Sequence, residues 1–288
     1  MFLISKLIAY IRREITFSFL SRLILLIVLI TGCSENPKEK EKTPTASVDV
    51  IPNLDYKIIA RIPHDTTAYT EGLFFHEQKL YESTGSPENL PFTKSIFGIV
   101  DLTNGQIDVK AELDRNKYFG EGIAMIKGRI YQLTYKNQVG FIYDSKTFKR
   151  IGSFGFNNIE GWGLTTDGVN LIMSDGTNVL TYLNPDDLTV VKTLNVSRNG
   201  YAEDNLNELE VINGFIYANV WTKDYINKID PQSGKVVAQI DLSTLTKEAK
   251  ESNNFVDVLN GIAFDSLSDK IYVTGKLWPH IFQIEFQH

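Results

Sequence analysis

The sequence predicts an all-β fold built from five similar units. From residue 54 onward, short runs of alternating apolar and polar residues are rich in aromatic and β-branched side chains, and turn residues separate them. A three-residue motif recurs with its middle position at residues 72, 122, 163, 208 and 261, which are 50, 41, 45 and 53 residues apart. Units of roughly 40 to 50 residues with four strands each are typical of β-propellers. We therefore expect a five-bladed β-propeller.

Each unit repeats the same order of strands. The first strand carries the motif, and the second is centred nine residues after the middle position in four units and eleven residues after it in the fifth. Third strands are expected at 95–100, 139–143, 179–183, 225–229 and 280–286. A turn containing Asp or Asn, often with Pro or Gly, follows four of them, and a fourth strand such as 235–241 then closes the unit. One short helix is expected at 243–252.

The fifth unit runs out of chain after three strands, while residues 56–62 precede the first unit and have no place in it. We expect this N-terminal strand to complete the last blade. Closure of this kind removes an exposed sheet edge and ties the two ends of the propeller together.

Residues 1–32 are interpreted as a signal peptide. An apolar run at 23–30 is too short to span a bilayer as a helix, and it follows a basic region that contains Lys6, Arg12, Arg13 and Arg22. The run ends in Ile-Thr-Gly-Cys, which resembles the bacterial lipobox, so Cys33 is expected to carry a lipid. The predicted product is an exported lipoprotein, anchored to a membrane through Cys33 on its periplasmic or cell-surface face.

Residues 33–53 are polar and are expected to form a disordered tether, which leaves 54–288 as the propeller domain. Removal of residues 1–32 leaves 25 basic and 34 acidic residues, a net charge of −9. An acidic exported chain without a Lys/Arg cluster is a poor candidate for binding nucleic acid. We expect a monomer. Cys33 is the only cysteine, so no internal disulfide forms.

The repeat places unusual residues around one mouth of the central channel. Because the first two strands of a unit are antiparallel, the start of the first and the end of the second lie at the same rim. The ten equivalent positions there are Glu71, Glu121, Trp162, Asn207, Asn260, Gly85, Tyr135, Gly176, Trp221 and Lys276. Aromatic walls with a few convergent polar groups are typical of a ligand pocket.

Each of these residues also has a simpler interpretation. Glu121 could be a solvated rim charge, the tryptophans core residues, Lys276 a loop charge and the asparagines turn residues. Their convergence at equivalent repeat positions favours the pocket, with Asn260 as its weakest member. Glycines flank Glu121 on both sides, and we expect them to let a ligand approach the backbone closely.

Several chemistries are excluded by what the sequence lacks. It contains no G-x-S-x-G motif, no phosphate-binding loop and no cysteine beyond the lipidation site. Its four histidines form no H-x-x-x-H pair or other obvious metal-ligand spacing. We therefore expect no metal and no cofactor, and a catalytic pocket would have to work with carboxylate, lysine and amide groups.

The chain from Leu54 to its end resembles the plant and bacterial glutaminyl-peptide cyclotransferase family. The similar segments are 119–123, 140–144, 161–168, 174–178, 206–210, 218–221, 257–263 and 273–279. The resemblance implies a five-bladed propeller that converts the N-terminal glutamine of peptides or proteins to pyroglutamate and releases ammonia. It also implies a mechanism distinct from that of the zinc-dependent animal enzymes.

The resemblance also implies roles for individual residues. Glu121 corresponds to the family's acid/base, with Asn207 and Lys276 as further catalytic residues, and the substrate-binding residues are Tyr69, Glu71, Phe119, Tyr135, Trp162 and Trp221. Three of these differ from the plant enzymes, which have phenylalanine, glutamine and tryptophan where this chain has Tyr69, Glu71 and Tyr135.

The expected mechanism uses one carboxylate for both proton transfers. Glu121 takes a proton from the substrate amine and passes it to the leaving nitrogen, while Lys276 and Asn207 stabilise the oxygen of the intermediate. Two alternatives remain open at this point: a lipoprotein that binds a ligand or protein without chemistry, and a metal-dependent propeller lactonase.

Overall fold

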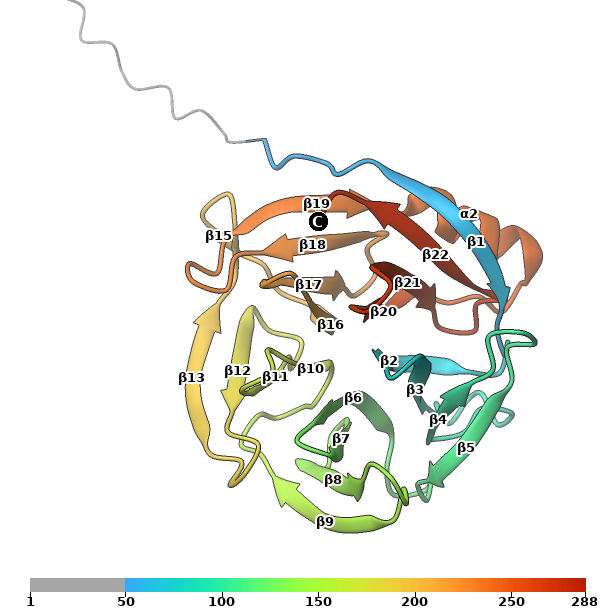
Figure 1. Ribbon diagram of the computed structural model, residues 1–288, viewed down its shortest axis with the longest axis vertical. Coiled ribbons are helices and arrows are strands. Elements are labelled where there is room, and N and C mark those ends of the chain that lie inside the picture. Colours follow the sequence, from blue (N-terminus) through green and yellow to red (C-terminus); the bar gives the residue numbers. More distant parts are fainter. Residues whose placement is uncertain (1–49) are drawn as a thin grey trace, which may run out of the picture. The chain divides into compact units, whose positions relative to one another are not determined.

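Five four-stranded antiparallel sheets surround a central channel in the computed structural model, which describes residues 50–288 (Figure 1). The first blade contains β2 (Tyr69–His76), β3 (Lys79–Gly85), β4 (Ile96–Val100) and β5 (Ile107–Glu112). The second contains β6 (Gly120–Ile126), β7 (Arg129–Thr134), β8 (Val139–Asp144) and β9 (Arg150–Gly155). The third contains β10 (Leu164–Thr166), β11 (Leu171–Met173), β12 (Val179–Leu183) and β13 (Val190–Asn195). The fourth contains β16 (Leu206–Ile212), β17 (Phe215–Val220), β18 (Tyr225–Ile229) and β19 (Val236–Asp241).

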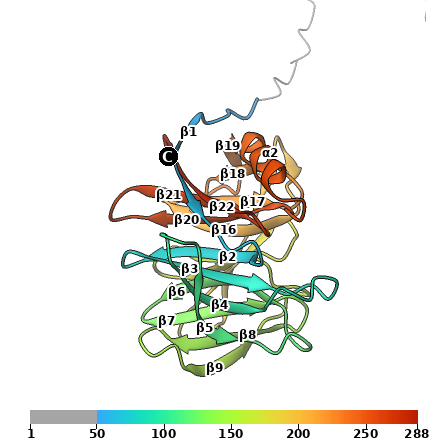
Figure 2. The same ribbon diagram turned by 90° about the vertical axis from the view of Figure 1, so that its right-hand side faces the viewer.

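The fifth blade takes its strands from both ends of the propeller, as the sequence predicts. β20 (Leu259–Asp265), β21 (Lys270–Gly275) and β22 (His280–Phe286) are completed by β1 (Tyr56–Pro63) on the outer edge. β1 pairs antiparallel with β22, and Figure 2 shows the two strands side by side. The five-bladed fold with an N-terminal closing strand is therefore confirmed.

Alternation of buried and exposed side chains explains how β1 holds its place. Its residues alternate strictly between half-buried and exposed, as expected for a strand with one face on the core. Ile62 packs against a core cluster that joins the first and fifth blades. Ile59 lies on the opposite, solvent-facing side of β1 and is 49% exposed.

This alternation makes a matched pair of substitutions informative. Ile62→Asp places a charge in the closing contact and should lower the free energy of unfolding by about 2 kcal/mol. Ile59→Asp on the solvent face should change it by less than about 0.5 kcal/mol. Thermal or denaturant unfolding of the two variants checks the difference. Equal stability of the two would show that β1 does not close the ring.

Two smaller elements complete the fold. The helix α2 (Ser243–Ser252) forms at the predicted residues and buries Leu245, Thr246 and Ala249. A two-stranded hairpin of β14 (Ser197–Arg198) and β15 (Tyr201–Ala202) was not predicted. Strands of two residues are too short to show a periodicity in the sequence.

Contacts with the propeller begin before the predicted domain boundary at residue 54. The amide of Gln239 in β19 donates to Pro52 O at 2.9 Å, and the amide of Leu54 donates to Gln239 O at 2.7 Å. The last residues of the expected tether therefore lie along the fourth blade. The predicted signal peptide, Cys33 and most of the tether lie outside the described residues. Within 50–288, no helix is both long enough and apolar enough to cross a membrane.

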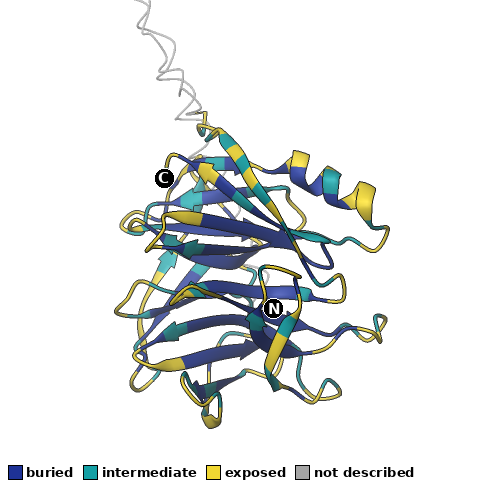
Figure 3. Cartoon of the chain, turned by 45° about the vertical axis from the view of Figure 1, so that its right-hand side comes forward, coloured by how far each residue is buried: buried dark blue, intermediate teal, exposed yellow. Residues whose placement is uncertain are grey.

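The core lies between neighbouring blades, where the inner strands are buried on both faces (Figure 3). This packing corrects the expected role of the motif glycines. A Cβ atom on Gly122 would lie 2.4 Å from Leu164 N, and one on Gly163 would lie 2.1 Å from Asn207 O. The absence of side chains at Gly122 and Gly163 thus lets the next blade approach, rather than a ligand.

In the fourth blade a glutamate takes the place of the motif glycine. The Glu208 carboxylate accepts the amides of Leu73 at 3.1 Å and Ile262 at 2.8 Å, which belong to the first and fifth blades. It therefore ties three inner strands together inside the channel. Burial raises the pKa of Glu208 well above its usual value.

Candidate active site

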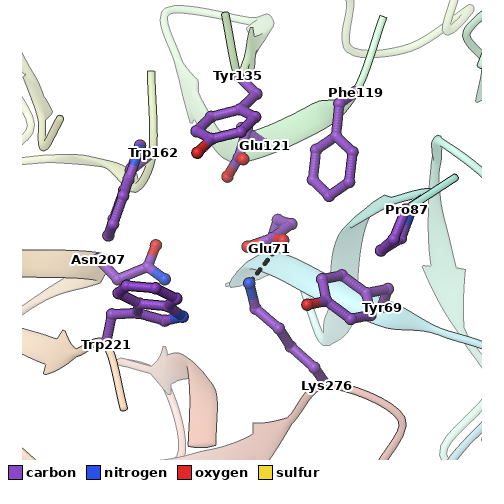
Figure 4. A pocket seen from close by; sticks show the side chains of 10 residues that line it. All are labelled: Tyr69, Glu71, Pro87, Phe119, Glu121, Tyr135, Trp162, Asn207, Trp221 and Lys276. Carbon is purple, nitrogen blue, oxygen red and sulfur yellow. Dashed lines mark hydrogen bonds and ion pairs between the residues drawn. The ribbon is translucent and has the colours of Figure 1, made fainter. Parts of the chain in front are cut away.

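One cavity of about 360 Å³ opens where the inner strands begin, which is a size suited to a small ligand. Its lining comprises Tyr69, Glu71, Pro87, Phe119, Glu121, Tyr135, Trp162, Asn207, Trp221 and Lys276 (Figure 4). Every catalytic and substrate-binding residue proposed from the sequence belongs to this set, and Pro87 is the only member that was not expected. All five blades contribute to the lining.

Bulges in the inner strands direct the polar side chains of the motif. The pairing register between the first and second strands shifts at the motif in four of the five blades. A bulge of this kind re-aims a side chain and is common next to active sites. In the third blade the motif instead precedes β10, and Gly163 N donates to Ser174 Oγ at 2.7 Å.

Three predicted rim positions support the cavity without lining it. A Cβ atom on Gly85 would lie 2.0 Å from the Phe119 ring, and one on Gly176 would lie 2.7 Å from the Trp162 ring. These two glycines therefore leave room for the aromatic walls. Asn260 is fully buried, and its amide donates to Thr70 O at 3.0 Å and to Glu71 Oε2 at 3.3 Å, so it holds a residue that does line the cavity.

The aromatic walls are fixed by contacts with one another and with acidic residues. Trp162 and Trp221 meet edge to face at 5.9 Å between ring centroids, and Tyr69 meets Phe119 at 6.1 Å. Trp162 Nε1 donates to Glu160 at 2.9 Å. The hydroxyl of Tyr69 donates to Asp257 at 2.9 Å. Sequence analysis missed Glu160 and Asp257, which lie in loops outside the repeated motif.

A buried ion pair lies on the floor of the cavity. Lys276 Nζ is 2.7 Å from Glu71 Oε1, and the two residues are 5% and 2% exposed. The ammonium also lies 4.7 Å from the centre of the Tyr69 ring, within the range of a cation–π contact. The lysine is therefore held between a carboxylate and an aromatic face, a contact that the sequence did not predict.

Glu121 lies next to this ion pair, and its side chain points toward Glu71 in Figure 4. Burial raises the pKa of Glu121 well above its usual value, and the neighbouring Glu71 carboxylate raises it further. Burial also raises the pKa of Glu71, to about 7, against the opposing effect of Lys276. Burial and the Glu71 charge thus both favour the protonated form of Glu121, while the ion pair with Lys276 favours the ionised form of Glu71.

Asn207 presents an unsatisfied acceptor. Its side chain is buried, and among the described residues its Oδ1 atom has no hydrogen-bond partner. A buried polar atom without a partner costs free energy, so an atom of this kind in a binding cavity is a candidate contact for a bound N–H group.

Metal ligands are not gathered at this site. Within residues 50–288, no group of three or more His, Cys, Asp or Glu side chains could hold a metal ion. The groups available for chemistry in the cavity are two carboxyls, one ammonium, one carboxamide and the aromatic rings.

The fold and the cavity together define a propeller protein with an acid–base site suited to amine or amide chemistry. Comparison with known proteins agrees with this class. A sequence profile described as glutamine cyclotransferase matches residues 24–286, and the chain belongs to that family.

Two relatives show how far the similarity extends. The glutaminyl-peptide cyclotransferase of Arabidopsis thaliana is 38% identical over 235 residues, which cover 81% of this chain and 72% of the plant protein. The crystal structure of Myxococcus xanthus glutaminyl cyclase has a TM-score of 0.75 and 35% identity, and the match covers 82% of this chain and 98% of that one.

Proposed function

We propose that this chain is a glutaminyl-peptide cyclotransferase, an acyltransferase that closes the N-terminal glutamine of peptides or proteins into pyroglutamate and releases ammonia. The observation that carries the proposal is the buried carboxyl of Glu121, placed beside the Glu71–Lys276 ion pair in an aromatic cavity. Membership of the glutamine cyclotransferase family supports it.

The reaction needs the substrate to fold back on itself. The α-amine attacks the γ-carboxamide carbon of the same residue, and an enclosed cavity that holds both groups close together replaces a flexible approach with a reactive one. The edge-to-face walls of Trp162 and Trp221 can confine the aliphatic part of the glutamine side chain.

Polar groups around the cavity can interact with the nitrogen and the oxygen of the substrate carboxamide. Asn207 Oδ1 can accept a hydrogen bond from a substrate N–H group. The Lys276 ammonium can stabilise the oxygen that becomes negative in the tetrahedral intermediate, although its bond to Glu71 means that it does so as part of an ion pair. Glu121, whose raised pKa favours the protonated form, can donate its proton to the leaving nitrogen.

The proposal is tested by incubating the protein with a glutaminyl dipeptide in the presence of a chelator. We expect stoichiometric ammonia and a product with a blocked N-terminus. Activity that appears only after a divalent metal is added would favour the lactonase-like alternative and contradict catalysis without a metal. Binding of the dipeptide without ammonia release would favour the non-catalytic binding protein.

Export and anchoring of the enzyme rest on residues 1–33 alone. The proposal is supported by the basic region, the short apolar run and the small residues before Cys33. Replacement of Cys33 by serine should move the protein from the membrane fraction to the soluble fraction. Retention of Cys33→Ser in the membrane fraction would contradict lipid anchoring.

A further inference from the structure

Two carboxyl groups share the floor of the cavity. Glu71 is held by Lys276 Nζ at 2.7 Å and by the Asn260 amide at 3.3 Å. The Glu121 carboxyl lies next to that of Glu71 in the cavity (Figure 4), and the Glu71 charge raises the pKa of Glu121. Two neighbouring carboxyl groups share one proton, because the repulsion between two negative charges makes it costly in free energy to ionise both.

The charges that face the pair decide which member keeps the proton. Glu121 faces the carboxylates of Glu71 and Glu160 and the ammonium of Lys276. Glu71 faces Asp257 and Glu121, but it alone makes the direct ion pair with Lys276. The ion pair with Lys276 at 2.7 Å favours the ionised form of Glu71, whereas Glu121 is buried without an ion pair among the described residues, which favours its protonated form. A protonated Glu121 cannot also accept a proton from the substrate amine.

We propose that Glu71 is a second catalytic residue, which takes the proton from the substrate α-amine while Glu121 gives its own proton to the leaving nitrogen. This division of labour rests on the proposed cyclotransferase function. It replaces the single carboxylate shuttle with an acid and a base that are already in the required protonation states before the substrate binds.

The proton and bond changes balance within the two residues. The amine nitrogen forms a bond to the γ-carbon, and Glu71 receives the proton that this nitrogen loses. Glu121 protonates the amide nitrogen as its bond to the γ-carbon breaks, and ammonia leaves. The proton on Glu71 then passes to the neighbouring Glu121, which restores the resting pair.

Apart from Glu121, none of the described residues that line the cavity supplies another carboxylate for this role. Lys276 is occupied as the cationic partner of Glu71, and the amide of Asn207 is not basic. The side chain of Asp257 accepts the Tyr69 hydroxyl and does not line the cavity. Plant relatives that have glutamine in place of Glu71 would lack the pair, so the proposal concerns chains with a glutamate at this position.

The test separates the two roles through the leaving group of the substrate. A peptide with N-terminal glutamate γ-methyl ester releases methanol, which needs far less help from an acid than an amide nitrogen does. We expect Glu121→Gln to lose about 10²-fold in kcat on the glutamine peptide but to return to within about tenfold of wild type on the ester. Glu71→Gln should lose at least about tenfold on both substrates, because the amine must lose a proton in either case.

Two further variants control the comparison. Glu71→Asp keeps a carboxylate and should recover part of the loss on both substrates. Glu88→Gln removes an exposed charge next to Pro87 without touching the pair, and its activity on both substrates should equal that of the wild type. Circular dichroism and unfolding curves establish that each variant is folded, and the uncatalysed rate of ester cyclisation is subtracted.

The outcomes distinguish this inference from the proposed function. If the wild type releases no ammonia from glutamine peptides, the cyclotransferase function itself is wrong. If the wild type is active, the paired roles are overturned when Glu121→Gln is equally impaired on amide and ester. They are also overturned when Glu71→Gln keeps wild-type kcat on both, since a single shuttle then suffices.

Discussion

Glu121→Gln lowers turnover of a glutamine peptide by about 10²-fold or more while the propeller stays folded. The carboxyl is almost completely buried, at 4% exposure, and its raised pKa favours the protonated form. Glutamine has nearly the same shape and can still donate a hydrogen bond, but it cannot transfer a proton to the leaving nitrogen. The loss should therefore appear in kcat, with a much smaller change in KM.

The measurement is steady-state ammonia release, together with a thermal unfolding curve for each protein. Glutamine has nearly the shape of glutamate and places no charge in the buried site, so we expect little loss of stability near pH 7. Glu160→Gln is a useful companion, because it changes the acceptor of the Trp162 indole without removing an acid from the cavity floor. Near-wild-type ammonia release by Glu121→Gln would show that the acid has been assigned to the wrong residue.

The strand pattern was predictable because every blade repeats it, so that a strand expected in one unit is supported by strands at equivalent positions in the others. The third strand of the second unit was expected at 139–143 and is found at Val139–Asp144. The closing role of β1 followed from the number of strands. The fifth unit had only three, and the strand at 56–62 belonged to no unit. The β14–β15 hairpin has no counterpart in the other blades, so the repeat could not predict it.

Backbone contacts between blades were beyond the reach of the sequence. Glycine beside an acid was interpreted as room for a ligand, whereas Gly122 faces the backbone of Trp162 and Leu164 in the next blade. A glycine in a local motif shows that a side chain is absent. It does not show which distant segment fills the space beside that glycine. That information depends on the inclination of neighbouring sheets, which no short pattern specifies.

In the cavity, too, some features could be predicted from the sequence and others could not. Residues at equivalent repeat positions, such as Trp162 and Trp221, could be placed at one mouth from spacing alone. The ion pair between Glu71 and Lys276 could not, because it joins the first and fifth blades, which lie far apart in the sequence and become neighbours only when the ring closes. Pro87 was also missed, since it lies in a loop after β3 that has no equivalent in the repeat. Most residues that line the cavity were thus predictable, whereas the contacts between their side chains were not.

Gly163→Ala should destabilise the propeller strongly, by about 3 kcal/mol, although it adds a single methyl group. The new Cβ atom would lie 2.1 Å from Asn207 O and 2.8 Å from the Cα atom of Glu208, both of which are backbone atoms of the fourth blade. A side chain could rotate away from such a clash, but an inner strand cannot move without disturbing the blades on either side. For a domain of this size, the Tm should fall by roughly 6 to 12 °C.

Gly152→Ala in the outer strand β9 is the matched control. Its Cβ atom would meet only Ile142 Cδ1 at 3.7 Å and Ile142 Cβ at 3.9 Å, which are ordinary contacts, so stability should change by less than about 0.5 kcal/mol. Because Asn207 itself lines the cavity, Gly163→Ala should also reduce ammonia release below the melting temperature, whereas Gly152→Ala should not. Equal Tm values for the two variants would mean that the inner strands can shift freely, and that the motif glycines do not set the distance between blades.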